Sequence, residues 1–444
     1  MQTNSLRFRL GAAVAAVLVL AILSAVIWRL YRGDGSLLRE VSVGATQISP
    51  NADGQEDITL IQYQLSRSAV VSIYFEDDAG TRYTFRNERL RGAGPYEVYF
   101  SGVVDGYRLP SDTLEGEIIA RLLPDGRYTW TIAAVDINGT AEQQTGQLTI
   151  ADASTELPEL RGFALDKESF TPNRDGIDDR VLIQYQLQKE AAVRVFLELP
   201  EGGEIPIGET ERDVPAGMPG RHYYDYEGGV DNGQTPPPDG QYVVTAVAED
   251  AEGQKIQVSQ PLTIALGGVP RADIFAPPSG DTFAVSGTAV ALCNTLSFTL
   301  TVENYGTTPI RTTGPAPGTV YDSDWNYNTL GWHTESGAWR VAIGYENELG
   351  NYPFRWAVGD ESTLEEIDGH LYLMPGQRAL ITGGIRMVGP LGERNPQPVW
   401  AGLIHEDVEV SQFNNRVDPK AILLDMPDEE NIRPCESREI EMRE

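Results

Sequence analysis

Residues 60–65 read LIQYQL, and the same six letters return at residues 182–187, an offset of 122 positions. The segments before them also match, since residues 49–57 read SPNADGQED and residues 171–179 read TPNRDGIDD. In LIQYQL apolar and polar residues alternate, which is the period of a strand with one buried face. Solenoid repeats are only about 20–50 residues long, so a period of this length indicates two copies of a whole domain.

Both copies carry turn signals around a further pair of strands. Asp-Gly dipeptides at residues 125–126 and 239–240 each precede a strand, and hairpin-type turns follow at residues 136–139 and 250–253. Short strands separated by such turns are typical of a β-sandwich of about 100 residues. Because 444 residues are too many for one such domain, we predict an all-β protein of tandem immunoglobulin-like or fibronectin-III-like β-sandwiches. Ig-like domain 1 is placed at residues 38–151 and Ig-like domain 2 at residues 157–266.

The second copy carries further short motifs in a fixed order. Its Thr-Pro-Asn-x-Asp-Gly-x-x-Asp segment is followed by Asp-Asn-Gly at residues 231–233, Pro-Asp-Gly-x-Tyr at residues 238–242 and Ala-Glu-Asp-x-x-Gly at residues 248–253. This pattern resembles the Ig-like domain of flagellar hook-capping proteins over about residues 40–265, although the first copy departs from it at residues 101–116. The resemblance implies an Ig-like fold and an exported, bacterial habitat, because similar modules occur in many secreted bacterial surface proteins. It does not imply a flagellar role.

A region of different composition follows a Gly-Gly-Val-Pro linker. Residues 296–303, LSFTLTVE, alternate like a strand and lead into Asn-Tyr-Gly, and a Pro-Gly-Gln turn follows at residues 375–377. Together with a late Asn-Asn pair, these motifs resemble the cell-adhesion-related domain found in bacteria. The resemblance implies a third, adhesion-type Ig-like sandwich, which we place at residues 271–425.

Residues 426–444 are rich in charge and lack apolar periodicity, which predicts a disordered acidic tail. The two cysteines of the chain are Cys293, in the third domain, and Cys435, in this tail. They are too few for a disulfide-stapled scaffold and have no metal-binding spacing. In an oxidising compartment they form one bridge that ties the tail to the domain, and otherwise they are two free thiols. The sequence leaves both alternatives open.

Residues 10–28 read LGAAVAAVLVLAILSAVIW and contain no charge. At a rise of about 1.5 Å per residue, this segment spans a hydrocarbon core of about 30 Å. We predict one uncleaved transmembrane anchor at residues 10–31 and a cytoplasmic stub at residues 1–9. A cleavable signal peptide is the alternative, but its apolar region is usually about 7–15 residues long and ends at small residues. Arginines flank both ends, so charge does not set the orientation; the exported type of the modules predicts that the bulk of the chain is extracellular or periplasmic.

The region between residues 321 and 356 holds four of the seven tryptophans. Trp325, Tyr327 and Trp332 stand among aspartate and asparagine residues, and we interpret them as an aromatic platform for a cell-surface glycan or a protein partner. Flat amphipathic rings give a large contact area at a small entropic cost. The alternative is that most aromatic residues of this region belong to the core, as the strand-like alternation around Trp339 indicates.

The two Asn-x-Asp-Gly-x-x-Asp segments each carry three oxygen-bearing side chains around a glycine turn. Such ligands suit Ca²⁺, the only cofactor that the sequence indicates. The segments are not EF-hands, because Leu60 and Leu182 stand where a bidentate glutamate is required. The alternative is an Asx turn in which these side chains bond to the local backbone and start the first strand. The candidate calcium ligands are Asn51, Asp53, Asp57, Asn173, Asp175 and Asp179.

The sequence contains no catalytic constellation that we recognise. Its four histidines lack the spacing of a zinc protease, and it has no Gly-x-Ser-x-Gly elbow, phosphate-binding loop or dinucleotide fingerprint. We therefore predict that the chain is not an enzyme, although a glycosidase would need only two carboxylates. With 65 acidic and 34 basic residues, the formal net charge is -31. This charge repels phosphate backbones and excludes nucleic acid as a partner.

These observations predict a non-enzymatic, membrane-anchored surface protein. Two Ig-like repeats form a stalk, and the aromatic-rich third domain acts in adhesion or as a scaffold. One alternative is a structural subunit of a cell-envelope or appendage assembly, in which edge strands pair with other copies or other subunits. Another alternative is a carbohydrate-binding module or a cryptic glycosidase.

Overall fold

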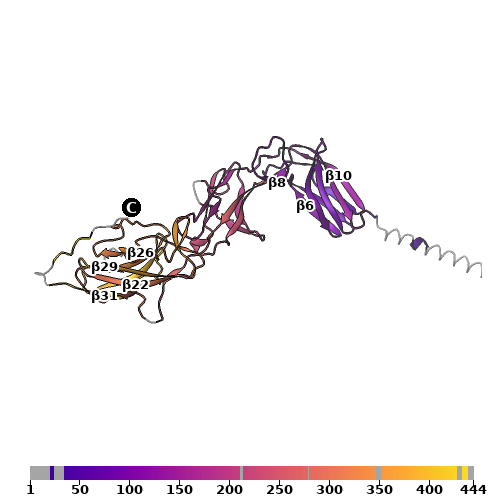
Figure 1. The fold of residues 1–444 in the computed structure, drawn as a ribbon. Helices are drawn as coiled ribbons and strands as arrows, with labels where there is room; N and C mark the ends of the chain where they lie inside the picture. The colour runs from indigo at the N-terminus through magenta and orange to yellow at the C-terminus, as the bar shows by residue number, and fades with distance from the viewer. Residues whose placement is uncertain are drawn as a thin grey trace, which may run out of the picture.

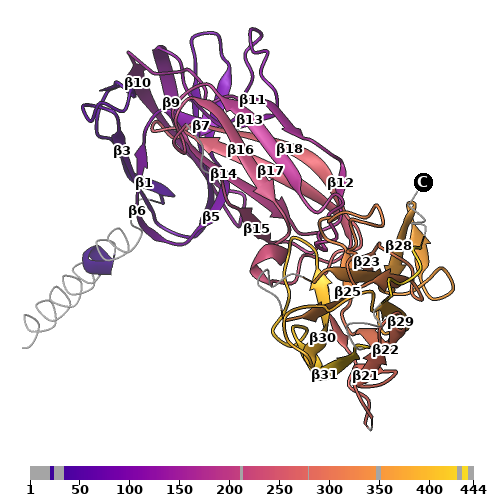
Figure 2. The same cartoon turned by 90° about the vertical axis from the view of Figure 1, so that its left-hand side faces the viewer.

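The computed structural model describes residues 21–24, 35–210, 214–278, 280–346, 352–427 and 433–438. In these residues the chain is all-β and forms three β-sandwiches that follow one another along the sequence (Figure 1). Domain 2 lies between domain 1 and domain 3 (Figure 2). The prediction of an all-β fold of sandwich type is confirmed.

The repeated LIQYQL segments form equivalent strands in domains 1 and 2. They lie in β3 (Thr59–Leu65) and β13 (Val181–Leu187), which show the same alternation of buried and half-buried residues. In β3 the side chains of Ile61, Tyr63 and Leu65 are buried in the core. A slip of one residue would turn this apolar face to solvent, so burial fixes the pairing register of each strand.

Domain 1 packs a three-stranded sheet against a five-stranded sheet. Besides β3 its strands are β1 (Leu38–Val43), β2 (Gln47–Ile48), β4 (Ala69–Glu76), β5 (Arg82–Arg91), β6 (Gly94–Phe100), β9 (Gly126–Asp136) and β10 (Ala141–Ile150). The smaller sheet has the order β1-β3-β6, and the larger has the order β2-β10-β9-β4-β5. In the core between the sheets, the rings of Phe75 and Phe100 stack with centroids 4.2 Å apart.

Domain 2 repeats this architecture with a few differences. Its further elements are β11 (Leu160–Leu165), β12 (Ser169–Phe170), β14 (Ala192–Glu198), β15 (Glu204–Ile207), β16 (Gly220–Tyr226), the 3-10 helix η1 (Val230–Asn232), β17 (Gly240–Glu249) and β18 (Lys255–Ile264). One sheet has the order β11-β13-β16, and the other contains β15-β14-β17-β18, with β12 beside β18.

A hairpin from the sequence of domain 1 completes the second sheet of domain 2. Its strands are β7 (Val103–Asp105) and β8 (Glu117–Leu122), and β8 pairs antiparallel with β18. Ile118 is buried in the hydrophobic core of domain 2. The backbone N–H of Leu122 donates to Oε1 of the buried Gln254 at 3.3 Å. The segment where the first copy departs from the repeat pattern therefore contributes to a hairpin that joins two domains, which the sequence did not predict.

Domain 3 is a larger sandwich of two sheets. Its strands are β19 (Ala272–Ile274), β20 (Ala284–Val285), β21 (Ala289–Ala291), β22 (Thr295–Asn304), β23 (Ile310–Thr312), β24 (Val320–Asp322), β25 (Trp339–Tyr345), β26 (Phe354–Ala357), β27 (Glu365–Ile367), β28 (His370–Leu373), β29 (Arg378–Arg386), β30 (Gln397–His405) and β31 (Val417–Asp425). One sheet has the order β19-β22-β29-β24, with β20 on β22. The other has the order β21-β31-β30-β25-β23-β28-β27, with β26 on β25.

Residues 433–438 near the C-terminus lie against domain 3. A disulfide joins Cys293 to Cys435. Nη1 of Arg438 donates to the backbone oxygen of Val320 at 3.1 Å. In the described part of the predicted tail, a covalent bond and a hydrogen bond therefore join residues 433–438 to the sandwich, and the disordered tail stays a prediction from the sequence.

No helix in the described residues is long and apolar enough to cross a membrane. The predicted anchor at residues 10–31 and the predicted stub at residues 1–9 lie outside those residues, apart from residues 21–24, which are helical. The anchor therefore stays a prediction from the sequence.

Candidate functional site

The three rings predicted as an aromatic platform lie on one loop of domain 3. Residues 323–338 connect β24 to β25, and we call them the aromatic loop. Trp325, Tyr327 and Trp332 pack against the core of the domain while part of each ring stays exposed. The backbone N–H of Trp332 donates to the backbone oxygen of Tyr327 at 3.1 Å, which brings these two residues together. The exposed polar residues of the loop include Asp324, Asn326, Asn328 and His333.

The other large aromatic residues of the region are mostly part of the core. Tyr321, Phe354 and Trp356 are fully buried, and the ring centroid of Tyr321 lies 5.4 Å from Phe354 and 5.0 Å from Trp356 in edge-to-face contacts. Trp339 is also buried. The core interpretation describes these four side chains, and an aromatic platform formed by the half-buried rings of the aromatic loop stays a prediction.

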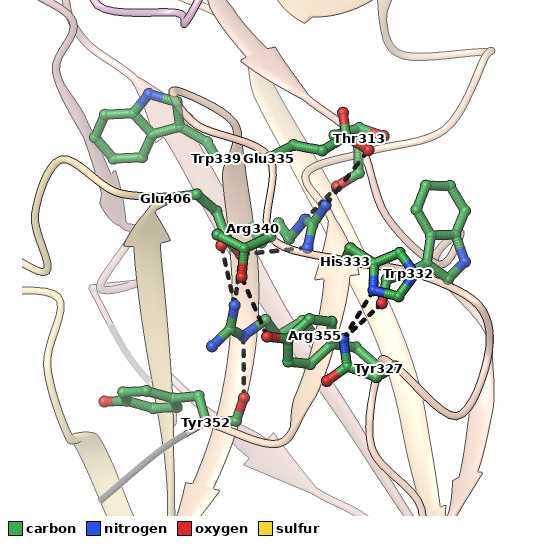
Figure 3. Close-up of polar contacts among 12 residues, drawn as sticks. Thr313, Tyr327, Trp332, His333, Glu335, Trp339, Arg340, Tyr352, Arg355 and Glu406 are labelled. Carbon is green, nitrogen blue, oxygen red and sulfur yellow. Dashed lines mark hydrogen bonds and ion pairs between the residues drawn. The ribbon is translucent and has the colours of Figure 1, made fainter.

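A buried charge cluster contacts the aromatic loop (Figure 3). It consists of Arg340, Arg355 and Glu406, which are 0%, 7% and 1% exposed, and we call it the arginine cluster. Nη1 of Arg355 donates to both carboxylate oxygens of Glu406, at 2.8 and 3.0 Å. Nη1 of Arg340 lies 3.3 Å from Oε1 of the same carboxylate. One carboxylate therefore serves two guanidinium groups.

Neighbouring strands of one sheet bring the cluster together. Arg340 lies in β25, Arg355 lies in β26 on one side of β25, and Glu406 directly follows β30 on the other side. Because side chains alternate along a strand, Arg340 points to the opposite face from Trp339. There its Nε donates to the backbone oxygen of Thr313 at 2.7 Å.

The cluster holds positive charge that Glu406 alone does not balance. Burial lowers the pKa of Arg340 below its usual range. The two terminal nitrogens of Arg340 have no hydrogen-bond partner among the described residues. A second carboxylate, that of Glu335, lies 3.9 Å from Nη2 of Arg340 and is partly exposed. Desolvation of such groups is costly, so the stability of domain 3 depends strongly on the remaining partner, Glu406.

The arginine cluster also holds the aromatic loop in place. The guanidinium carbon of Arg355 lies 4.1 Å from the ring centroid of Tyr327, a cation–π contact. Nε of Arg355 donates to the backbone oxygen of Tyr352 at 3.0 Å, and the hydroxyl of Tyr321 donates to the backbone oxygen of Arg355 at 2.7 Å. The cluster therefore fixes the half-exposed ring of Tyr327 against the guanidinium group of Arg355.

The second Asp-Gly loop is a contact between domains 2 and 3. Nε of Arg311 donates to the backbone oxygen of Asp175 at 2.7 Å, and the hydroxyl of Tyr372 donates to Oδ2 of Asp175 at 2.8 Å. Nε2 of His405 donates to the backbone oxygen of Arg174 at 2.8 Å. Three side chains of domain 3 therefore hold one loop of domain 2.

Arg311 connects this joint to the aromatic loop. Its Nη2 donates to the backbone oxygen of Ser336 at 2.6 Å, and its Nη1 lies 3.4 Å from a carboxylate oxygen of Glu335. Glu335 in turn faces Arg340. A chain of polar contacts therefore runs from domain 2 through Arg311 to the aromatic loop and the arginine cluster.

The two Asp-Gly loops share their internal hydrogen bonds but differ in their surroundings. In both loops the last aspartate, Asp57 or Asp179, accepts hydrogen bonds from three backbone N–H groups. Asp53 in the first loop is exposed, whereas the equivalent Asp175 is 4% exposed under domain 3. The same local sequence thus forms the same turn in both copies, and only the second copy is covered by the neighbouring domain.

The proposed calcium ligands use side-chain oxygens within these turns. Oδ1 of Asn51 accepts from the N–H of Asp53 at 3.0 Å, and Oδ1 of Asn173 accepts from the N–H of Asp175 at 3.0 Å. This is Asx-turn geometry. Among the described residues, no group of three or more His, Cys, Asp or Glu side chains is arranged to hold a metal ion. Calcium binding by the loops stays a prediction.

Two titratable groups at the joint should make opposite contributions to stability. Burial lowers the pKa of His405 to about 4, and burial together with the charge of Asp175 raises the pKa of Asp179 to about 6. As the pH is lowered from about 6.5 to 4, the unfolded chain protonates this histidine and the folded chain does not, so the free energy of unfolding falls. As the pH is lowered from about 6 to 4, the folded chain protonates Asp179 and the unfolded chain does not, so the free energy of unfolding rises.

We therefore expect the contributions of His405 and Asp179 to the pH dependence of stability largely to cancel in the native chain. A variant that lacks one of the two groups should show the contribution of the other. Asp179→Asn should lose on the order of 3 kcal/mol of stability between about pH 6.5 and 4, because only His405 still titrates. His405→Gln, which keeps a hydrogen-bond donor, should gain a similar amount over about pH 6 to 4. Thermal unfolding across this pH range measures both. Parallel pH profiles for the two variants would contradict the assignment.

The sequence patterns did not point to the residues of domain 3 in the joint or to the arginine cluster. A usable signal was a charged residue inside an apolar run, as in WRVAIGY of β25 and FRWA of β26. A charge at such a position requires a buried partner. The missed residues are Arg311, Arg340, Arg355, Tyr372, His405 and Glu406.

The described residues define an all-β protein of three tandem sandwiches with a half-buried aromatic loop on the third. No family model matches the chain, and no curated protein matches it. A tetra-tandem repeat from the extending region of a large adhesion protein is 13% identical, with 82% of this chain and 80% of that chain covered and a TM-score of 0.17. A Ca²⁺-stabilised adhesin with which an Antarctic bacterium binds ice is 13% identical, with 78% and 74% covered and a TM-score of 0.21.

A further similar structure comes from a 1.5-MDa bacterial ice-binding adhesin. It is 10% identical, with 79% of this chain and 98% of that chain covered and a TM-score of 0.17. The resemblance to the hook-capping module is not shown by these comparisons. Similarity at this level carries no conclusion about the function of the chain.

Proposed function

We propose that the chain is a non-enzymatic, membrane-anchored surface protein in which domains 1 and 2 form a stalk for domain 3. The aromatic loop of domain 3 contacts a protein or a cell-surface glycan in adhesion. The observation that carries this proposal is that both joints are built from buried contacts. Ile118 of β8 enters the core of domain 2, and Asp175 is held by Arg311 and Tyr372 of domain 3.

Such joints suit a stalk because they limit the freedom of each domain relative to the next. A joint without buried contacts would be expected to move freely. Three sandwiches in series extend on the order of 100 Å, given a radius of gyration of about 13 Å per 100 residues. The aromatic loop is tied to the distal joint through Arg311 and Ser336. The contact surface is therefore fixed in direction as well as held at a distance.

Small-angle X-ray scattering tests the stalk. A fragment of residues 35–444 retains all three hydrophobic cores, the first of which begins at Leu37. We expect an extended monomer with a maximum dimension on the order of 100 Å and little spread in shape. Filaments or sheets formed by this fragment would contradict the stalk and favour a structural subunit of an envelope or appendage assembly.

Replacing two rings of the aromatic loop tests the contact surface. Trp325→Ala combined with Trp332→Ala should weaken binding to the partner by about tenfold or more, because aromatic residues dominate such interfaces. The control is Phe413→Ala, since Phe413 is a ring of domain 3 outside the aromatic loop and is 77% exposed. Binding is measured on a glycan array and on intact cells. Unchanged binding by the double variant would rule out the aromatic loop as the contact surface.

A further inference from the structure

One end of domain 1 exposes a row of apolar side chains. The register of the five-stranded sheet places Leu90 of β5, Val70 of β4 and Val135 of β9 side by side. They are 77%, 37% and 42% exposed, and Ile137, at the tip of the following hairpin, is 97% exposed. Exposed single apolar residues are common, but a row of large ones that continues into an apolar hairpin tip indicates a contact surface.

This end of domain 1 is also where the chain leaves the N-terminal segment. The N–H of Ser66 donates to the backbone oxygen of Leu37 at 3.1 Å, and Nη1 of Arg67 donates to the backbone oxygen of Gly35 at 3.4 Å. Residues 66 and 67 lie three and two positions before Ala69, the first residue of β4, which pairs with the last residue of β5 and of β9. We call this end, with its apolar row and the tip residue Ile137, the proximal end.

Basic side chains lie at the proximal end of a protein whose net charge is -31. Of the four arginines in β5, Arg89 and Arg91 lie at this end, whereas Arg82 pairs with Glu76 at the other end of the strand. Arg89 and Arg91 flank Leu90 and are exposed. The acidic groups close to them are mostly engaged, since Asp136 pairs with Arg67 at 2.7 Å and Glu142 accepts the backbone N–H of residue 38 at 3.0 Å. Exposed apolar tips beside arginines are suited to the interface of a bilayer with anionic lipids.

The second copy of the domain supplies an internal comparison. In domain 2 the counterparts of Val70 and Val135 are Ala192 and Glu249, both exposed, and the equivalent hairpin tip is Ala251. Strand β15, the counterpart of β5, pairs only with residues 195–198 and places no side chain beside Ala192. That end of domain 2 lies next to residues of domain 1, Asn51 among them. The end that faces another described domain thus carries small and polar residues, whereas the proximal end carries large apolar ones. Exposure to solvent alone would favour polar residues at the proximal end and apolar residues at the end that faces another domain.

The six residues between the uncharged segment and domain 1 limit how far the proximal end can lie from that segment. The uncharged segment ends at residue 28, and residues 29–34 separate it from Gly35. Six extended residues reach no more than about 22 Å. Two of them, Arg29 and Arg32, are also basic. If residues 10–28 cross a membrane, the proximal end lies within reach of the headgroup layer.

We propose that the proximal end of domain 1 binds the bilayer surface. Leu90 and Ile137 enter the interfacial region, while Arg89 and Arg91 contact anionic lipid headgroups. This proposal rests on the membrane anchor of the proposed function. It assigns domain 1 a second contact with the membrane, which sets the direction in which the stalk leaves the surface.

A fluorescent label at the hairpin tip tests this contact. The full chain with Ile137→Cys is labelled with an environment-sensitive fluorophore and reconstituted into vesicles of equimolar phosphatidylcholine and phosphatidylglycerol. The native cysteines are held in their disulfide and do not react. We expect the emission to move to shorter wavelength and to rise several-fold on vesicles. The matched control is Ala251→Cys at the equivalent tip of domain 2, whose emission should not change.

Further arms separate the anchor from the surface contact. Arg89→Glu with Arg91→Glu, in the Ile137→Cys background, should remove most of the emission gain, as should vesicles of phosphatidylcholine alone. If the full chain floats with vesicles but the label at position 137 stays aqueous, the surface contact is overturned and the anchor stands. If the full chain does not float, the anchor fails and the contact with it. An emission gain in detergent that grows with protein concentration would instead assign the proximal end to a second copy of the chain.

Discussion

Glu406→Ala is expected to lower the free energy of unfolding of domain 3 by about 3–5 kcal/mol, the usual cost of removing one partner of a buried ion pair. The substitution removes the carboxylate that lies 2.8 Å from Arg355 and 3.3 Å from Arg340. Both guanidinium groups then stay buried, and the partly exposed Glu335 is the nearest remaining carboxylate for Arg340. For a domain of this size the melting temperature should fall on the order of 10 °C. Differential scanning calorimetry measures the change.

An exposed ion pair in the same domain provides the control. Nη2 of Arg378 lies 3.1 Å from Glu303, and their side chains are 50% and 28% exposed. Glu303→Ala should cost less than about 1 kcal/mol, as is usual for surface pairs. The tryptophan emission of Glu406→Ala should also change below its melting temperature, because Arg355 no longer holds Tyr327. Equal melting temperatures for the two variants would show that the arginine cluster does not support domain 3.

The sandwich fold could be predicted because its signals are local. The alternation in LIQYQL depends on neighbouring residues, and both copies of the segment became strands with the same buried face. The Asp-Gly loops were likewise recognised from residues within seven positions of one another. Their Asx-turn geometry follows from side chains that bond to the adjacent backbone.

The arginine cluster could not be predicted from the same alternation. In a strand with one buried face, the residue after Trp339 is expected on the solvent side. In β25 both faces are buried. On the second face the aromatic loop covers Arg340, with the Tyr327 ring 5.9 Å away, and Tyr352 packs against Ala342. A two-residue period identifies which side chains share a face, but it does not show whether a distant loop covers that face.

The contacts that join the domains could not be predicted for a related reason. Asp175 receives its hydrogen bonds from Arg311 and Tyr372, which are 136 and 197 positions away in the sequence. Its counterpart Asp53 has the same local motif and no such cover. The sequence identifies the turn in both copies, and only the packing of whole domains decides which turn becomes a joint.

The matched glycines of the two loops allow the second joint to be opened by one methyl group. Gly176 and Gly54 have nearly the same backbone conformation, with φ values of +83° and +84°. Alanine in this left-handed conformation costs roughly 1–2 kcal/mol at either position. A Cβ at Gly54 meets nothing within 4 Å, whereas a Cβ at Gly176 would lie 2.0 Å from the backbone oxygen of Ser336 in domain 3. Gly176→Ala must therefore separate the two loops.

We expect Gly176→Ala to break the joint between domains 2 and 3 while Gly54→Ala leaves the shape of the chain unchanged. Loss of the hydrogen bonds from Arg311, Tyr372 and His405, at about 1 kcal/mol each, adds to the backbone strain that both variants share. Scattering curves should show a broader range of shapes for Gly176→Ala only, and proteolysis near the linker at residues 267–270 should be faster. If the two variants behaved alike, the contacts at Asp175 would not hold domains 2 and 3 together. Domain 3 would then move freely relative to the stalk.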